Sequence, residues 1–539
     1  MKRAAILLLY LTLAVSCGSP AAAVQAPPVT PLAPDSLRTW LTAISSDEFE
    51  GRATFSPGLD KAAAYIADRL KEAGVRPGGD EGSYLQKVEV LTVQSTNQST
   101  LTVEVNGVSR TFRNGEDVFF QPDVGGKRTL TLNDVEFVGY GLHIRSIHDD
   151  YAGRDVRKKA VVWLGDGIPA TVVDLPGAGR FLEARASTAL EEMGAAASLT
   201  LSPRFRGRRF GSSTFVTTER LDSPRPPEVA VSDDVLGFIF SASGLNYEEI
   251  KGHAALLENL PPATIKGVKL IFNLDADYRV TNTRTTQNVV GFIDGSDPQL
   301  KSTYVAFGAH YDHLGIDEDL RTTADEDRIN NGADDDGSGT TALIGLANAF
   351  MKGSRPRRSI MLAWHAGEER GLWGSKYLAD HPPVPIDSIV AQLNIDMIGR
   401  NRDNLDSEEN TVYAVGADRI STELHNLLVD ANASMSVPLK IDFEMNDSAD
   451  PERIYFRSDH FSYAAKGIPI IFFFTGLHPD YHQVTDSVEK IHFDKLSHIT
   501  NLVYQLGLRL GNLDHAPVRD FKGPRTGRGF SGKLITDNN

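Results

Sequence analysis

Five clusters of histidine and carboxylate residues in the second half of the chain have the types and spacing for metal or acid–base chemistry. Four of them come directly after apolar runs of strand length, and the fifth precedes a run with helical periodicity. Because ligand sites in open α/β sheets lie beyond the carboxyl ends of strands, these side chains can converge in space. The clusters are at 310–313, 367–369, 396 and 480–482, with the acidic triplet at 334–336.

The mixture of imidazole and carboxylate narrows the choice of metal. It suits zinc, cobalt or manganese, whereas a calcium site is built from oxygen alone. The acidic triplet also lacks the alternating ligands and the terminal Glu of an EF-hand loop. A catalytic zinc typically takes three protein ligands, so a larger set suits two ions that share a bridging carboxylate. Each cluster alone is explained by an ordinary structural role, such as a solvated turn. Only the combination of all five favours a metal site.

Strands and helices alternate from about residue 284, which favours an α/β fold. A helix is expected over Leu59–Ala73, with Gly74 as its stop, and another over Thr340–Met351. Between about 115 and 280, short alternating strands and many turn residues predict a β-rich segment. The strands expected to position the clusters are Asn288–Ile293, Tyr304–Gly308, Ile360–Trp364, Val390–Ile395 and Ile468–Phe474.

Several motifs resemble the M28 family of zinc peptidases, which includes bacterial leucyl-type aminopeptidases and glutamate carboxypeptidase II. The segment Ser45–Arg52 resembles the amino-terminal part of that family, and Asp150–Val156 resembles its protease-associated insertion. The resemblance implies an α/β zinc-exopeptidase (phosphorylase/hydrolase-like) fold. That fold is a three-layer αβα domain with a mixed central sheet, and here it carries a mainly β protease-associated insertion. The catalytic motifs are His310–Asp312, Asn331–Gly339, Gly367–Ser375, Asn394–Met397 and His482–Asp486.

Roles follow from the resemblance residue by residue. Asp335 would bridge two zinc ions, with His310 and Asp396 completing one site and Glu369 and His482 the other. Co²⁺ or Mn²⁺ are possible substitutes for Zn²⁺.

The resemblance also assigns residues that are not metal ligands. Glu368 would be the general base, Asp312 would hold the ring of His310, and Asp459 would have a supporting role. The remaining nearby histidines, His313, His365 and His460, are interpreted as pocket or structural residues.

The expected organisation begins with an export signal. Lys2 and Arg3 precede an apolar stretch that is too short to span a bilayer, and Leu13–Gly18 resembles a bacterial lipobox with Cys17 as the acylated residue. The alternative is ordinary cleavage after 21–23. We expect a cell-envelope lipoprotein facing the periplasm, anchored to the membrane through Cys17, or otherwise a periplasmic or secreted protein. The predicted segments are 1–16 (signal peptide), 17–36 (lipidated linker), 37–114 (first part of the peptidase domain), 115–280 (insertion), 281–515 (catalytic domain) and 516–539 (flexible tail).

Composition excludes several classes of function. The formal charge is −16, so the chain has no net attraction to phosphate backbones and no nucleic-acid partner is expected. Its one cysteine excludes both an intramolecular disulfide and a thiolate zinc site.

The resemblance implies an aminopeptidase that acts on peptide substrates. A carboxypeptidase or dipeptidase like glutamate carboxypeptidase II stays open, because an arginine cluster in the insertion could recognise a substrate carboxylate. A single-zinc glutaminyl cyclase and a non-catalytic binding homologue also stay open. The cluster consists of Arg204, Arg206, Arg208 and Arg209.

Overall fold

The structure is a computed structural model. It describes residues 32–121, 127–144, 147–175, 177–201, 216–220, 225–241, 243–317, 327–447 and 449–520. The predicted signal peptide, Cys17 and the arginine cluster at 204–209 lie outside these residues. Across the described ranges, no helix is both long and apolar enough to cross a lipid bilayer.

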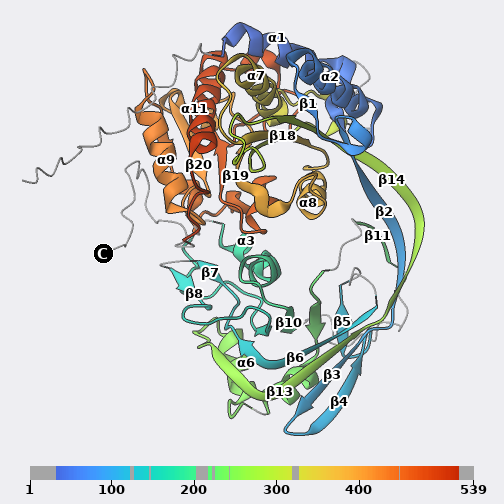
Figure 1. The fold of residues 1–539 in the computed structure, drawn as a ribbon. Helices are drawn as coiled ribbons and strands as arrows, with labels where there is room; N and C mark the ends of the chain where they lie inside the picture. Colours follow the sequence, from blue (N-terminus) through green and yellow to red (C-terminus); the bar gives the residue numbers. More distant parts are fainter. Residues whose placement is uncertain are drawn as a thin grey trace, which may run out of the picture. The chain divides into compact units, whose positions relative to one another are not determined.

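A mixed sheet of ten described strands carries the histidine and carboxylate clusters (Figure 1). Its four central strands, β18, β15, β19 and β22, run parallel, and the neighbours on either side, β14 and β20, are antiparallel to them. All five strands predicted from the sequence are confirmed. The order is β11 (Val216–Arg220), β2 (Leu85–Asn97), β14 (Ala276–Ile293), β18 (Ser359–His365), β15 (Tyr304–His310), β19 (Ile389–Ile395), β22 (Ile470–Phe474), β20 (Thr411–Val415) and β21 (Lys440–Asp442), with β1 (Arg76–Pro77) beside β14.

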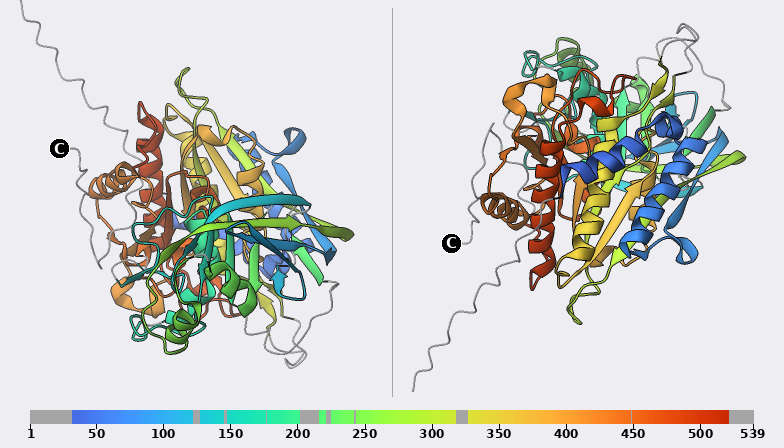
Figure 2. Two further views of the ribbon diagram at one scale, coloured as in Figure 1. Left: turned by 90° about the horizontal axis from the view of Figure 1, so that it is seen from below. Right: turned by 90° about the horizontal axis from the view of Figure 1, so that it is seen from above.

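Helices cover both faces of this sheet, as the side chains of β15 show. Successive strand residues point to opposite faces. Phe307 packs on Phe350 of α7, with ring centroids 5.4 Å apart, whereas Ala306 belongs to an apolar cluster with Leu378 of α8 and Phe461 of α10. The layers are therefore helix, sheet, helix, as predicted. One layer contains α1 (Pro34–Ile44), α2 (Pro57–Ala73), α7 (Gly339–Lys352) and α11 (Phe493–Asn512), seen in the right view of Figure 2, and the other contains α8 (Trp373–Asp380) and α10 (His460–Ala464).

The ends of α2 follow from its sequence. Ser56 accepts a hydrogen bond from the amide of Leu59, and Pro57 occupies the first turn, where its missing N–H costs nothing. Gly74 ends the helix in the left-handed region, with φ of 80°. The predicted helix and its glycine stop are confirmed.

We expect Gly74→Ala to lower the free energy of unfolding by about 1–2 kcal/mol, the cost of a left-handed conformation for an L-residue. A Cβ there would meet only Met351 Cε, at 3.4 Å, so strain and not a clash sets the cost. The matched control is Gly252→Ala in α6 (Tyr247–Ala255), where a Cβ meets nothing within 4 Å. That change should stabilise by about 0.5–1 kcal/mol. Thermal unfolding should show a lower stability for Gly74→Ala and a higher stability for Gly252→Ala. Changes of the same sign in both variants would contradict the assignment of Gly74 as a left-handed helix stop.

A second sheet of eight described strands has its own apolar core. Two of its strands, β4 and β3, precede residue 115, so the sheet begins upstream of the predicted start of the insertion. The segment also contains helices, including α3 (Ala178–Glu183), α5 (Asp233–Phe240) and α6. Its assignment as a protease-associated domain stays a prediction. The strand order is β4 (Val108–Arg113), β3 (Thr100–Val105), β13 (Ala263–Leu274), β6 (Arg128–Phe137), β9 (Ala160–Trp163), β10 (Ala197–Leu201), β12 (Glu228–Val231) and β5 (Val118–Phe120).

Two other predicted boundaries differ from the structure. Helix α1 begins at Pro34, inside the predicted linker. The first residues of the predicted flexible tail are bound to the start of α9 (Thr422–Ala433), where Asp520 Oδ1 accepts from the amide of Thr422 at 3.2 Å. The amide of Val518 also donates to Glu423 Oε2 at 2.9 Å. Asp520 thus satisfies one of the amide donors that a helix start leaves free, a long-range contact that no local pattern reveals.

Candidate active site

The predicted site residues lie at adjacent strand ends of the large sheet. His310 is the last residue of β15, and Asp396 directly follows β19, its neighbour. Glu368 and Glu369 follow β18 on the other side of β15. Asp335 comes from the helical turn η5 (Ala333–Ser338) that leads into α7. The predicted convergence of these clusters is therefore confirmed.

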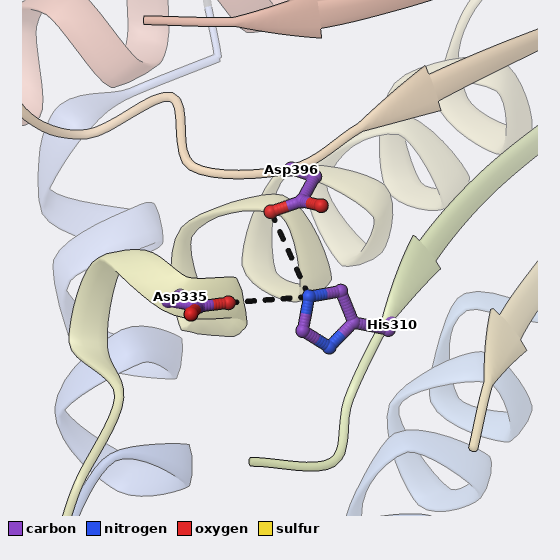
Figure 3. Close-up of side chains that lie close together, drawn as sticks. All are labelled: His310, Asp335 and Asp396. Atoms are coloured by element: carbon purple, nitrogen blue, oxygen red, sulfur yellow. Dashed lines mark ion pairs between the residues drawn. The ribbon is translucent and has the colours of Figure 1, made fainter. Parts of the chain in front are cut away.

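One set of ligand atoms surrounds His310 (Figure 3). Its Nε2 lies 3.2 Å from Asp335 Oδ1 and 3.6 Å from Asp396 Oδ1. All three residues are buried. Asp396 Oδ2 accepts a hydrogen bond from Ser458 Oγ at 2.7 Å, which leaves Oδ1 directed at the histidine. These three side chains could together hold one metal ion.

A second set of ligand atoms lies on the other oxygen of Asp335. His482 Nε2 is 3.1 Å from Asp335 Oδ2 and 3.2 Å from Glu369 Oε2. His313 Nδ1 is 3.0 Å from Glu369 Oε1 and 3.8 Å from Asp335 Oδ2. The carboxylate of Asp335 thus contributes one oxygen to each set. From the sequence, His313 was interpreted as a pocket or structural residue and not as a neighbour of the predicted ligands. The only sequence feature that could have indicated this position is its spacing of three residues from His310.

The other two acids of the triplet have structural partners. Asp334 Oδ1 accepts from the amide of Gly399, and Asp336 Oδ1 accepts from the amides of Gly339 and Met397 at 2.8 and 3.2 Å. Asp336 is completely buried and holds the start of α7 against the loop after β19. Of the triplet, Asp335 alone directs its carboxylate at His310 and His482, whereas Asp334 Oδ2 lies 3.3 Å from His478 Nε2.

The ring of His310 is held by Asp312 through the main chain. Its Nδ1 lies 3.1 Å from the main-chain carbonyl oxygen of Asp312, whereas the Asp312 carboxylate is 3.8 Å away. That carboxylate accepts from Thr54 Oγ1 at 2.9 Å and from the amide of Glu368 at 3.1 Å. Asp312 therefore positions both His310 and Glu368, the first through its backbone and the second through its side chain.

Glu368 lines a pocket beside the two ligand sets. None of the described residues donates a hydrogen bond to its carboxylate. Burial raises its pKa well above the usual value, and the charges of Glu369, Asp459 and Asp396 act in the same direction. Asp459 itself lies behind the site, with Oδ2 3.2 Å from His365 Nδ1, and His365 Nε2 lies 3.0 Å from the Tyr463 hydroxyl. The supporting role expected for Asp459 stays a prediction, and the contact that the structure gives its carboxylate is with His365.

His460 serves packing. Its Nε2 lies 2.7 Å from the carbonyl oxygen of Tyr455, and its ring stacks on Phe472. Burial lowers its pKa to about 3, so the ring is neutral at physiological pH. This matches its interpretation as a structural residue.

The charge balance of the site favours a cation. Burial acts to lower the pKa of His310, yet Asp396 and Asp335 raise it well above the ordinary value. The same competition between burial and the carboxylates of Asp335 and Glu369 raises the pKa of His482 to about 10. A surplus of carboxylate charge around two imidazoles is the environment in which a metal cation replaces the ring protons.

A pocket with a mixed polar and apolar lining opens beside the two ligand sets. Glu368 and the predicted ligands His310, Asp335, Asp396 and His482 are part of its lining. Arg457 also lines the pocket and pairs with Glu452 at 2.9 Å. Tyr481 next to His482 was not singled out from the sequence as a pocket residue. The apolar lining consists of Met397, Ile454, Phe472, Phe474, Leu477 and Tyr481.

Curated proteins and solved structures that are similar to this chain include zinc metalloproteases and aminopeptidases. A "Probable zinc metalloprotease" of Leptosphaeria maculans is 39% identical over 112 residues, covering 21% of this chain and 24% of that protein. A "Probable leucine aminopeptidase" of Arthroderma benhamiae is 26% identical over 215 residues, covering 38% and 54%. The chain thus spans about a quarter and about half of these relatives. The solved aminopeptidase from Aneurinibacillus sp. strain AM-1 is 17% identical, with a TM-score of 0.45 over 92% of this chain and 98% of that one.

The family model for peptidase family M28 matches residues 288–507. This range runs from the end of β14 through most of α11 and includes both ligand sets and Glu368. Both ligand sets lie inside the matched range, and residues 288–507 of this chain are similar to peptidase family M28.

Proposed function

We propose that this chain is a co-catalytic dizinc exopeptidase and that it removes residues from the amino end of peptides. The observation that carries the proposal is the shared carboxylate of Asp335, whose two oxygens contact separate histidines. A shared carboxylate between two nitrogen–oxygen ligand sets is the arrangement of a two-metal site.

The donor atoms fit zinc in kind and in spacing. Ligand atoms about 2.0–2.1 Å from a tetrahedral zinc ion lie about 3.3 Å from one another. The distances from the His310 and His482 Nε2 atoms to the carboxylate oxygens are 3.1–3.6 Å. His310, Asp335 and Asp396 would hold one ion, and His482, Glu369 and Asp335 the other. Bound ions supply Lewis acidity that lowers the pKa of water and polarises a carbonyl oxygen.

Glu368 is the residue of this chain that moves protons. Its carboxylate takes a proton from the attacking water and passes it to the leaving amine, which is general base and then general acid catalysis. The amide of Glu368 is fixed by Asp312, so its side chain stays beside the ligand sets. The partly enclosed pocket limits competing water around that carboxylate.

The pocket selects an apolar side chain at the first subsite. Away from the catalytic set its lining is mainly apolar, and Arg457 is the charged residue there, which disfavours lysine or arginine in the substrate. We therefore expect leucine, methionine or phenylalanine at the amino end of good substrates.

A leucyl p-nitroanilide should have a kcat/KM about 10-fold or more above that of the alanyl analogue. Alanine lacks carbon atoms that leucine buries in the pocket, and the loss of even one methylene from an apolar pocket has an effect of this size. Leu477→Ser should remove most of that preference by lowering the leucyl rate alone. The control is Leu405→Ser, because Leu405 is 50% exposed and does not line the pocket. Equal loss on both substrates would contradict this pocket as the first subsite.

Metal analysis followed by digestion of a peptide library tests the function itself. Two zinc ions per chain and residues released from free amino ends are expected, with no cleavage of amino-blocked peptides. Release from the carboxyl end would favour the carboxypeptidase or dipeptidase alternative. One ion with cyclisation of amino-terminal glutamine would favour a glutaminyl cyclase, and no hydrolysis would favour a binding protein.

A further inference from the structure

The amino-terminal motif at 45–52 has no role in the chemistry described so far, yet its last residue is among the most buried cations of the described chain. Arg52 is 1% exposed. Burial lowers its pKa, while the negative charges of Asp335, Asp336 and Asp486 oppose that change. Its guanidinium donates to four main-chain carbonyl oxygens at 2.8–2.9 Å, those of Ile44, Tyr311, Asn331 and Gly332.

The carbonyls other than that of Ile44 belong to the loop that follows His310 and to the loop that precedes Asp335. Tyr311 follows His310 directly, and Gly332 precedes Asp335 by three residues. The carbonyl oxygen of Arg52 also accepts from the amide of His313 at 3.0 Å. One arginine therefore fixes the loop of His310 against the loop of Asp335 through hydrogen bonds that need no metal.

The backbone around Arg52 is strained, which shows that its position is determined by its surroundings. Glu50, Gly51 and Arg52 all have φ between 51° and 64°, a region that costs a non-glycine residue of order 1 kcal/mol or more. At Gly51 a Cβ would lie 2.6 Å from the carbonyl oxygen of Asn330 and 2.7 Å from that of Gly315. Glycine at 51 thus lets the motif approach both loops closely enough for Arg52 to reach them.

We propose that Arg52 is a positioning residue for the metal site, holding the loops of His310 and Asp335 at their binding distance before a metal arrives. The inference rests on the proposed dizinc site. Preorganised ligands bind more tightly because less conformational freedom is lost on binding. Lysine cannot replace this arginine, since its three donors sit on one nitrogen and cannot reach carbonyls on separate loops.

Competition with a chromogenic chelator measures the zinc dissociation constants of wild type and of Arg52→Lys. We expect binding of at least one ion to weaken by about 10–100-fold, the usual effect of losing a residue that orients ligands. The absorption spectrum of the cobalt-substituted variant should change as well, because the coordination geometry changes. The matched control is Arg185→Lys in α4 (Arg185–Ser187), where Arg185 also donates to main-chain carbonyls, those of Leu182 and Gly165.

The outcomes separate this inference from the proposed function. If wild type binds no zinc tightly, the dizinc proposal itself fails. If wild type binds two ions and Arg52→Lys binds them as tightly, while both lysine variants lose similar thermal stability, Arg52 is structural only.

Hydrogen exchange of the wild-type protein tests the inference even if the variant does not fold. The amides of His313 and Gly337, which donate to the carbonyls of Arg52 and Gly332, should stay protected after zinc is removed. Loss of their protection with the core strands intact would overturn preorganisation by Arg52.

Discussion

Glu368→Gln lowers kcat by about 10²–10⁴-fold while both zinc ions stay bound, the loss expected when a general base is removed. Glutamine has nearly the shape of glutamate and lines the same pocket, but it cannot accept the proton of the attacking water. KM should change little, because the pocket walls that contact the substrate side chain are untouched. Steady-state kinetics with a leucyl substrate and metal analysis of the same sample measure both halves of the expectation.

Two further variants sharpen this result. Glu368→Asp keeps the carboxylate but withdraws it by one methylene, so its kcat should lie between wild type and Glu368→Gln. Glu89→Gln is the control, because Glu89 is exposed on β2 and lies outside the pocket. A glutamine variant that loses zinc would make Glu368 a ligand, and one within about tenfold of the wild-type kcat would remove it from the mechanism.

The sequence predicted that the histidine and carboxylate clusters lie at strand ends because that placement depends on local pattern. Apolar runs end directly before His310 and Asp396, and parallel strands bring such ends to one edge of a sheet. Helix α2 could be predicted for the same reason, since Gly74 marks its end within the local sequence. Residues whose roles are set by strand order and turn chemistry can therefore be found in a single sequence.

Residues that act through distant contacts could not be found in this way. Arg52 reaches carbonyls 259–280 positions away along the chain, apart from Ile44, and no periodicity signals such a pairing. The sequence could not show that Asp312 contacts His310 through its backbone, because a motif names residues and not atoms. The pocket combines Met397, Ile454 and Leu477 from three loops, so its apolar character appears only after folding.

Asp335→Asn tests the shared carboxylate more directly than any other change. Both ligand sets lose the charged oxygen that Asp335 contributes and keep only the carboxylate of Asp396 or of Glu369, so we expect zinc content to fall from two ions to less than one per chain. Activity should fall by at least about 10²-fold, because removing both ions removes the Lewis acidity on which the reaction depends. Variants of unshared ligands, Asp396→Asn and His482→Gln, should each retain close to one ion.

The neighbouring acid provides the control for Asp335→Asn. Asp336→Asn keeps an oxygen that can accept from the amides of Gly339 and Met397, so it should retain both zinc ions even if thermal stability falls. If the carboxylate of Asp335 is shared by both ions, Asp335→Asn loses more zinc than either Asp396→Asn or His482→Gln. If all three ligand variants retain one ion each, Asp335 serves only one metal and the two ligand sets are independent.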